Sequence, residues 1–206
     1  MENLKAIKTI PKNGNEELSF NEINIRFSLL DFWKWSVSDL MSNATRGRLA
    51  EFIVGTSVGL NPENLRDEWD AYDITSDNGI KIEVKSASYI QSWSQREFSK
   101  ISFSIKKAKF WDADNGMSRG EAKRHAEVYV FCLLKHKNQE TIDPLKLEQW
   151  EFYVLPTYKL DNYERSQFSI TINSLRKLTE PIEYVLLKDK IEKCYQEQVK
   201  IKDFQL

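Results

Sequence analysis

Two carboxylates and a lysine lie close together in the segment DAYDITSDNGIKIEVK, which spans residues 70–85. Two short runs rich in apolar residues, 71–75 and 80–86, flank the turn sequence Ser-Asp-Asn-Gly, and this pattern predicts a β-hairpin. Carboxylate oxygens are the ligands that Mg²⁺ and Mn²⁺ prefer, and a neighbouring lysine can orient water or neutralise charge in a transition state. These residue types therefore favour metal-assisted hydrolysis.

The register of this hairpin decides whether the charged side chains meet. A three-residue turn that ends at Gly79 places Asp73 opposite Glu83, whereas a two-residue turn places Asp73 opposite Val84, on the apolar side. Glycine suits the left-handed residue that ends a three-residue turn. We therefore expect Asp73 to project on the same side as Glu83 and Lys85. The apolar face is then predicted to contain Tyr72, Ile74, Ile80, Ile82 and Val84.

A third carboxylate, Glu51, lies in a predicted helix over residues 44–58, which Asn43 or Thr45 begins and Gly59 ends. Glu51 shares a partly apolar face with the residues three, four and seven positions further on, so we expect it to face the sheet. A salt bridge to the arginine one turn earlier, Arg48, is an equally good interpretation of this glutamate.

The arrangement resembles the PD-(D/E)XK nuclease superfamily, which has the restriction-endonuclease-like fold: a helical Glu51, then Asp73 at a strand, then Glu83-x-Lys85 on the next strand. The resemblance covers about residues 44–156 in element order. It implies an α/β fold of the αβββαβ type and metal-dependent hydrolysis of phosphodiester bonds in nucleic acid, DNA more than RNA. By residue, it implies that Asp73 and Glu83 bind Mg²⁺ or Mn²⁺, that Glu51 assists the metal shell, and that Lys85 activates or positions water.

The resemblance also points to possible accessory residues of the site. Tyr72 stands where many members have the proline of the motif, and Asp70 is a rival to Asp73 that needs a β-bulge to reach the same face. Gln91 and Gln95 follow the predicted Lys85 strand, near where some members of the superfamily use a glutamine.

Charge is distributed unevenly around the predicted site. Residues 61–95 contain seven acidic and three basic side chains, and residues 96–124 contain four acidic and eight basic ones. An acidic patch beside a basic one fits a metal site next to a phosphate track, and it also fits a solvated surface with an uneven charge pattern. The predicted nucleic-acid contacts are Arg96, Lys100, Lys106, Lys107, Lys109, Arg119, Lys123 and Arg124.

The hydrophobic pattern predicts one α/β or α+β domain around a mixed central sheet flanked by helices. We divide it into an N-terminal arm and helix that pack on the core (1–43), the nuclease-like core (44–160) and a C-terminal helical extension (161–206). Predicted helices cover 29–41, 121–126, 174–178 and 181–195, and predicted strands cover 101–105, 127–134 and 150–155, with a loop over 111–120. The last helix is expected to use the apolar stripe Ile182, Val185, Leu186 and Cys194.

Composition excludes several function classes. A net charge of −1 argues against a protein that coats nucleic acid by bulk charge, and two cysteines with two distant histidines argue against a zinc site. We see neither a signal peptide nor an apolar run long enough to span a membrane, so we expect a cytoplasmic protein without membrane partners. A homodimer would let two sites cut both strands of a duplex.

Two other hypotheses explain the same residues. In one, the chain is a non-catalytic module of the same fold that binds nucleic acid or protein. In the other, Asp73–Lys85 and Glu51–Arg48 are structural salt bridges, and the function lies elsewhere.

Overall fold

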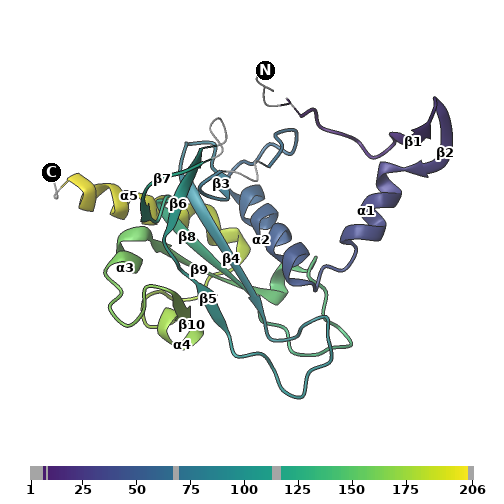
Figure 1. Cartoon of the computed structure of the whole chain (residues 1–206). Helices are drawn as coiled ribbons and strands as arrows, with labels where there is room; N and C mark the ends of the chain where they lie inside the picture. Colours follow the sequence, from purple (N-terminus) through teal and green to yellow (C-terminus); the bar gives the residue numbers. More distant parts are fainter. Residues whose placement is uncertain (1–6, 8, 67–69, 113–116, 204–206) are drawn as a thin grey trace.

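A four-stranded sheet with the order β3-β4-β8-β9 lies at the centre of the chain, as the computed structural model shows (Figure 1). The structure describes residues 7, 9–66, 70–112 and 117–203, without the side chains of 110–119 and 202–203. The strands are β1 (Glu17–Phe20), β2 (Ile23–Ser28), β3 (Ile74–Thr75), β4 (Lys81–Ser88), β5 (Ser102–Ser104), β6 (Ala108–Asp112), β7 (Met117–Lys123), β8 (Val128–Leu134), β9 (Trp150–Pro156) and β10 (Ser169–Thr171). The helices are α1 (Leu29–Val37), α2 (Asn43–Ser57), α3 (Thr157–Asp161), α4 (Ile172–Leu175) and α5 (Leu187–Asp203), with 3₁₀ turns at Leu147–Gln149 and Tyr184–Leu186.

The sheet is mixed, because β4 and β8 pair in parallel while β3 and β9 pair antiparallel at the two edges. All seven residues of β8 are buried, since packed layers cover both faces of the sheet. Helices α2 and α5 cover one face and bury Ile53, Val54, Leu187 and Ile191 against it. Strands β5 and β10 with helices α3 and α4 cover the other face (Figure 1). The predicted α/β architecture with a mixed central sheet flanked by helices is therefore confirmed.

The hairpin that begins this sheet has the predicted register. Ile74 pairs with Ile82 and Thr75 with Lys81, which is the pairing of a three-residue turn, and Gly79 has a φ of +80°. One part of the prediction is wrong, because Tyr72 packs in the cluster on the opposite face of the sheet from Ile74. Regular pairing begins only at Ile74, so strand alternation does not fix the direction of Tyr72.

Helix α2 carries the expected end signals, with one difference. Its cap is Ser42, whose hydroxyl accepts a hydrogen bond from the Thr45 backbone N–H at 3.3 Å, rather than Asn43 or Thr45. The helix ends before Gly59, which has a φ of +81°. Arg46 on its buried side donates to the Met41 carbonyl, so the start of α2 is fixed to the chain that precedes it.

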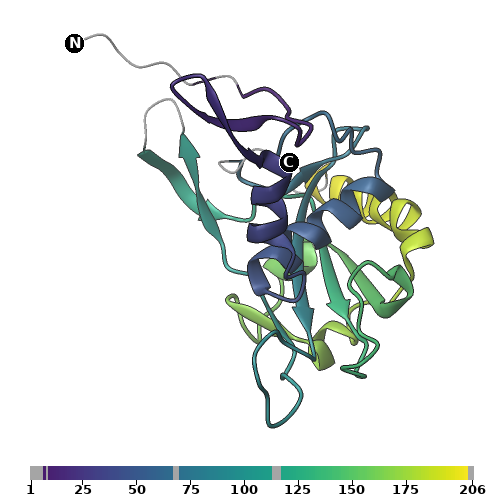
Figure 2. The ribbon, with the colours of Figure 1, turned by 90° about the vertical axis from the view of Figure 1, so that its right-hand side faces the viewer.

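The N-terminal arm, residues 13–37, consists of the β1–β2 hairpin and α1. Ser28 caps α1, and Asp31 completes a capping box with it. All nine residues of α1 are described and none of them is buried. The arm was expected to pack on the core, but it stands away from the core beyond α2 (Figures 1 and 2). The β1–β2 hairpin lies near the same end of the molecule as the β6–β7 hairpin (Figures 1 and 2).

The predictions for residues 111–126 are wrong. In place of a loop over 111–112 and 117–120 and a helix over 121–126, strands β6 and β7 form an antiparallel hairpin that ends at Lys123. Residues 113–116 of the predicted loop lie outside the described residues. In the described part of the chain these two strands pair only with each other, outside the central sheet. A strand outside the central sheet needs no apolar alternation, which is the pattern that would indicate a strand in the sequence.

The C-terminal helix begins later than predicted, at Leu187 rather than at residue 181. The backbone of Ile182 exchanges two hydrogen bonds with Phe152 of β9, and this bridge keeps the chain extended. As a result Val185 and Leu186 are exposed, and the buried side of α5 is formed by Leu187, Ile191 and Cys194. Helix 174–178 is likewise displaced, to Ile172–Leu175. Among the described helices, none has the length and apolar character needed to cross a membrane.

Candidate active site

Asp73 lies against strand β4 through both its backbone and its side chain. Its N–H donates to the Ile82 carbonyl at 3.1 Å, and its Oδ2 accepts a hydrogen bond from the Val84 N–H at 2.8 Å. On β4, Ile82 and Val84 face the buried cluster under α2, so Glu83 and Lys85 project from the opposite face by strand alternation. The hairpin therefore holds Asp73 beside the Glu83-x-Lys85 strand, as its sequence predicts.

Lys85 lies between the two carboxylates. Its ammonium forms a direct ion pair with Glu83 Oε1 and lies 3.9 Å from Asp73 Oδ2. The side chains of Asp73 and Glu83 are 17% and 18% exposed, so water screens their mutual repulsion only in part. The lysine thus compensates two partly buried negative charges at once.

Glu51 joins the same cluster through an arginine that the sequence did not indicate. Arg66 Nε lies 2.5 Å from Glu51 Oε2, and Arg66 Nη2 lies 3.8 Å from Asp73 Oδ1. The interpretation of Glu51 as a partner of Arg48 is therefore replaced by a pair with Arg66. Arg66 lies in a charged connector without a motif, and only the folded chain brings it beside α2 and β3.

Burial dominates the electrostatics of Glu83. It raises the pKa of the Glu83 carboxyl above its ordinary value, the carboxylates of Asp73 and Glu51 raise it further, and the ammonium of Lys85 opposes both. Tyr129 lies opposite Glu83 on β8, and its pKa is raised by its own burial and by the charge of Glu83. The interior beside Glu83 therefore disfavours additional negative charge.

A cavity of about 500 Å³ opens beside the cluster, between α2 and β3. Its wall includes Glu51, Arg66, Asp73 and the rival carboxylate Asp70, together with the exposed Arg48. Glu83 and Lys85, which are both described, do not line it. Asp73 therefore connects the cavity with the Glu83-x-Lys85 strand, and Asp70 does not take its place on β4.

The three carboxylates are hard oxygen donors of the kind that Mg²⁺ and Mn²⁺ bind. In the described part of the chain, no three acidic, histidine or cysteine side chains converge closely enough to enclose a metal ion. Instead, the nitrogen atoms of Arg66 and Lys85 approach their oxygens. The three carboxylates are therefore suitable ligands for a hard metal ion. In this structure the side chains of Arg66 and Lys85 contact them instead.

Residues 24–173 match the protein-family model described as bacteriophage T4 endonuclease IV. The chain belongs to this family. No curated protein and no solved structure matches the chain. The matched span contains Glu51, Arg66, Asp73, Glu83 and Lys85, so the whole cluster lies in the part that the chain shares with this endonuclease family. Membership supports a nuclease activity on nucleic acid.

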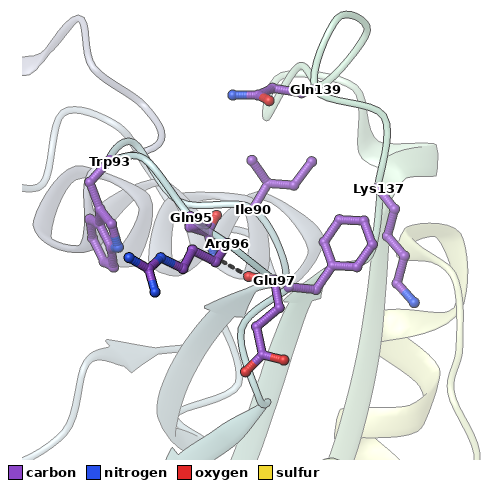
Figure 3. Close-up of a pocket in the computed structure, with 8 residues that line it drawn as sticks. Ile90, Trp93, Gln95, Arg96, Glu97, Lys137 and Gln139 are labelled. Atoms are coloured by element: carbon purple, nitrogen blue, oxygen red, sulfur yellow. Dashed lines mark hydrogen bonds between the residues drawn. The ribbon is translucent and has the colours of Figure 1, made fainter.

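The predicted accessory residues Gln91 and Gln95 bind the loop that follows β4, and in the described part of the chain their hydrogen bonds do not involve the three carboxylates. The Gln91 side chain donates to the Ser88 carbonyl and accepts from Arg46, and Gln95 Oε1 accepts from the Gln91 N–H. Both amides therefore hold the loop that follows β4. This loop borders a second cavity of about 370 Å³, lined by Ile90, Trp93, Gln95, Arg96, Glu97, Phe98, Lys137 and Gln139 (Figure 3).

The predicted nucleic-acid contacts divide into two groups. Arg124 is buried and donates to the Ile105 carbonyl, to Asp161 and to Gln167, so its prediction as a phosphate contact is corrected to a structural role. The side chain of Arg119 lies outside the described residues. The remaining side chains are exposed: Arg96, Lys100, Lys106, Lys107, Lys109 and Lys123.

Proposed function

We propose that the chain is a divalent-metal-dependent nuclease of the PD-(D/E)XK type that hydrolyses phosphodiester bonds in DNA. The observation that carries this proposal is the position of Asp73, which is hydrogen-bonded to β4 at Val84 beside Glu83 and Lys85. Family membership supports nuclease chemistry, and this cluster is the arrangement in the described chain that best suits it. The resemblance to restriction-endonuclease-like enzymes favours DNA as the substrate.

In this proposal Asp73 and Glu83 hold Mg²⁺ or Mn²⁺, with Glu51 completing the shell. The ion would supply Lewis-acid stabilisation of the phosphate and a more acidic water. Lys85, whose ammonium already lies at both carboxylates, positions that water or neutralises charge that develops on the phosphate. The exposed lysines of the 96–124 segment bind the phosphates on either side, which gives affinity that depends on salt.

A titration of Mn²⁺ tests the metal site directly. Wild-type protein is expected to bind Mn²⁺ in a calorimeter, and the Asp73→Ala/Glu83→Ala double variant is expected to release no heat. Matched DNA and RNA oligonucleotides with Mg²⁺ or Mn²⁺ then test the substrate. Wild-type protein that binds no Mn²⁺ and cuts neither polymer contradicts the proposal.

The second candidate is a binding module without catalysis. The ion pairs of Arg66 and Lys85 with the carboxylates favour it, because these side chains compensate the acidic charges without a metal. This candidate predicts binding of nucleic acid that weakens with salt and does not change with Mn²⁺ or with Glu83→Ala. The same titration therefore separates the two functions.

We also propose that the working form is a homodimer built through the N-terminal arm. A two-stranded hairpin and a nine-residue helix are each marginal in isolation, and the arm exposes nine large apolar side chains. Its four acidic and two basic residues disfavour nucleic acid as the partner, whereas a second copy brings an apolar arm of the same kind. The apolar side chains are Leu18, Phe20, Ile23, Ile25, Phe27, Leu30, Phe32, Trp35 and Val37.

A further inference from the structure

Arg66 connects the helix of the candidate site with its strand. The guanidinium uses Nε for Glu51 on α2 and approaches Asp73, just before β3, with Nη2. The Arg66 side chain is nevertheless 40% exposed, while the carboxylates that it contacts are 15% and 17% exposed. All three side chains line the cavity beside the cluster, and Arg66 is the most exposed of them.

The two oxygens of Asp73 are in different environments. Oδ2 accepts the Val84 N–H at 2.8 Å and lies 3.9 Å from the Lys85 ammonium. Oδ1 is the oxygen that faces Arg66, at 3.8 Å from Nη2. A cation that binds Asp73 at Oδ1 leaves the hydrogen bond to β4 intact and takes the side where the guanidinium already lies.

The same competition applies at Glu51, whose two oxygens both lie near Arg66. Nε donates to Oε2, and Nη2 lies 3.4 Å from Oε1. A planar guanidinium suits this side-on contact with a carboxylate, and it suits a phosphate for the same reason. Because Arg66 lines the cavity of about 500 Å³, rotation of its side chain out of the cluster leaves the guanidinium beside a space that can admit a phosphate.

We propose that Arg66 exchanges between two partners: its guanidinium bridges Glu51 and Asp73 when no divalent cation is bound, and it binds a phosphate of the nucleic acid when these carboxylates hold one. This inference rests on the proposed function, since it assumes that Glu51 and Asp73 are ligands. The inference assigns phosphate binding to Arg66, which lies in the connector after α2 and is not part of the motif formed by Asp73 and Glu83-x-Lys85. It also makes metal binding and substrate binding cooperative, because each removes the competitor of the other.

Metal affinity in the absence of nucleic acid gives the first test. Arg66→Ala is expected to bind Mn²⁺ about tenfold more tightly than wild type in calorimetry, because a competing cation is gone. Arg66→Lys keeps a positive charge but lacks the planar fork, so its Mn²⁺ affinity is expected to lie between the two. Arg48→Ala is the matched control, because Arg48 lines the same cavity and takes part in no ion pair among the described residues. Its Mn²⁺ affinity should stay within about twofold of wild type.

Binding of a DNA oligonucleotide in the presence of Ca²⁺, a hard cation that also prefers oxygen ligands, gives the second test. Arg66→Ala is expected to lose about tenfold in DNA affinity with Ca²⁺ and to change little without it. Equal Mn²⁺ affinities for wild type and Arg66→Ala, in variants whose circular dichroism and melting are unchanged, overturn this inference alone. No Mn²⁺ binding by either protein overturns the proposed metal site and this inference with it. Arg66→Gln, which keeps most of the side-chain stem, replaces Arg66→Ala if the alanine variant does not fold.

Discussion

The Val84 N–H donates a hydrogen bond to Oδ2 of Asp73 across the β3–β4 hairpin, at 2.8 Å. This bond joins the residue before the edge strand to the middle of the Glu83-x-Lys85 strand. Strand β3 has only two residues, so at Asp73 this side-chain hydrogen bond takes the place of a further strand pairing. It also leaves Oδ1 of the carboxylate for other partners. Asp73 therefore contributes both to stability and to the candidate metal site, and different substitutions at this position separate the two contributions.

Asp73→Ala is expected to destabilise the protein by about 1–2 kcal/mol, because it leaves the Val84 N–H without its acceptor. Asp73→Asn keeps a side-chain oxygen for that N–H, so its unfolding free energy is expected to stay within about 1 kcal/mol of wild type. Both variants should lose Mn²⁺ binding. Urea unfolding measures the first effect and calorimetry the second. An Asp73→Asn protein that binds Mn²⁺ like wild type contradicts the assignment of Asp73 as a ligand.

Lys85→Met removes the ammonium between Glu83 and Asp73 while keeping most of the apolar stem. If Lys85 acts on water or on phosphate charge, cleavage is expected to fall about 10²–10⁴-fold. Mn²⁺ binding should persist, because the carboxylates remain and lose a competing cation. Single-turnover cleavage at saturating Mn²⁺ measures the effect. Near-normal cleavage by Lys85→Met would leave Lys85 with a structural role.

The hairpin explains how much of the site was predictable from the sequence. The alternation of Ile80, Ile82 and Val84 fixed the register, and the register placed Asp73 beside Glu83. These are local constraints within about a dozen residues. Arg66 could not be found in the same way, because its contacts with Glu51 and Asp73 depend on the path of the connector in the folded chain.

Other parts of the fold follow the same distinction. Strands β8 and β9 were predicted because burial on both faces requires continuous apolar runs. The β6–β7 hairpin was missed, because strands outside the central sheet need no such pattern. The late start of α5 depends on the bridge between Ile182 and Phe152, a contact between distant segments that helix periodicity cannot indicate.

The pH dependence of stability provides a test of Glu83. Burial raises its pKa above the ordinary value of 4.5, with Asp73 and Glu51 adding to the shift and Lys85 opposing it. The folded protein therefore holds this proton more tightly than the unfolded chain. The protonated Glu83 carboxyl contributes fully to stability below about pH 4.5, and this contribution is lost as the pH rises through the raised pKa of the folded state.

Glu83→Gln has no proton to lose in that range. In metal-free buffer, we therefore expect its melting temperature to exceed that of wild type at pH 7.5 and to approach it at pH 4. Glu148→Gln, at an exposed position outside the site, is the control and should follow wild type throughout. If the difference in melting temperature between Glu83→Gln and wild type instead grows as the pH falls, the pKa of Glu83 is not raised in the folded protein.

Lys123 and Arg124 are neighbours with opposite expected roles. Arg124→Ala leaves the Ile105 carbonyl and Asp161 without their buried donor, so we expect a loss of about 2–4 kcal/mol in unfolding free energy. Lys123→Ala is expected to change stability by less than about 0.5 kcal/mol, because the residue is exposed. Lys123→Ala should instead lower the slope of log binding constant against log salt by about one. Equal effects of the two variants on the salt slope would contradict this division.

The exposed arm predicts the mass of the protein in solution. Light scattering after size exclusion is expected to give twice the chain mass of 24.2 kDa for wild type. Trp35 is 85% exposed and Phe20 70%, so Trp35→Asp and Phe20→Asp should leave the monomer fold intact and shift the mass to one chain. Phe168→Asp is the control, because Phe168 is 68% exposed outside the arm, and this variant should stay dimeric. A wild-type protein that is monomeric at all concentrations up to about 100 μM, where even a weak dimer forms, would show that a second copy does not cover the arm.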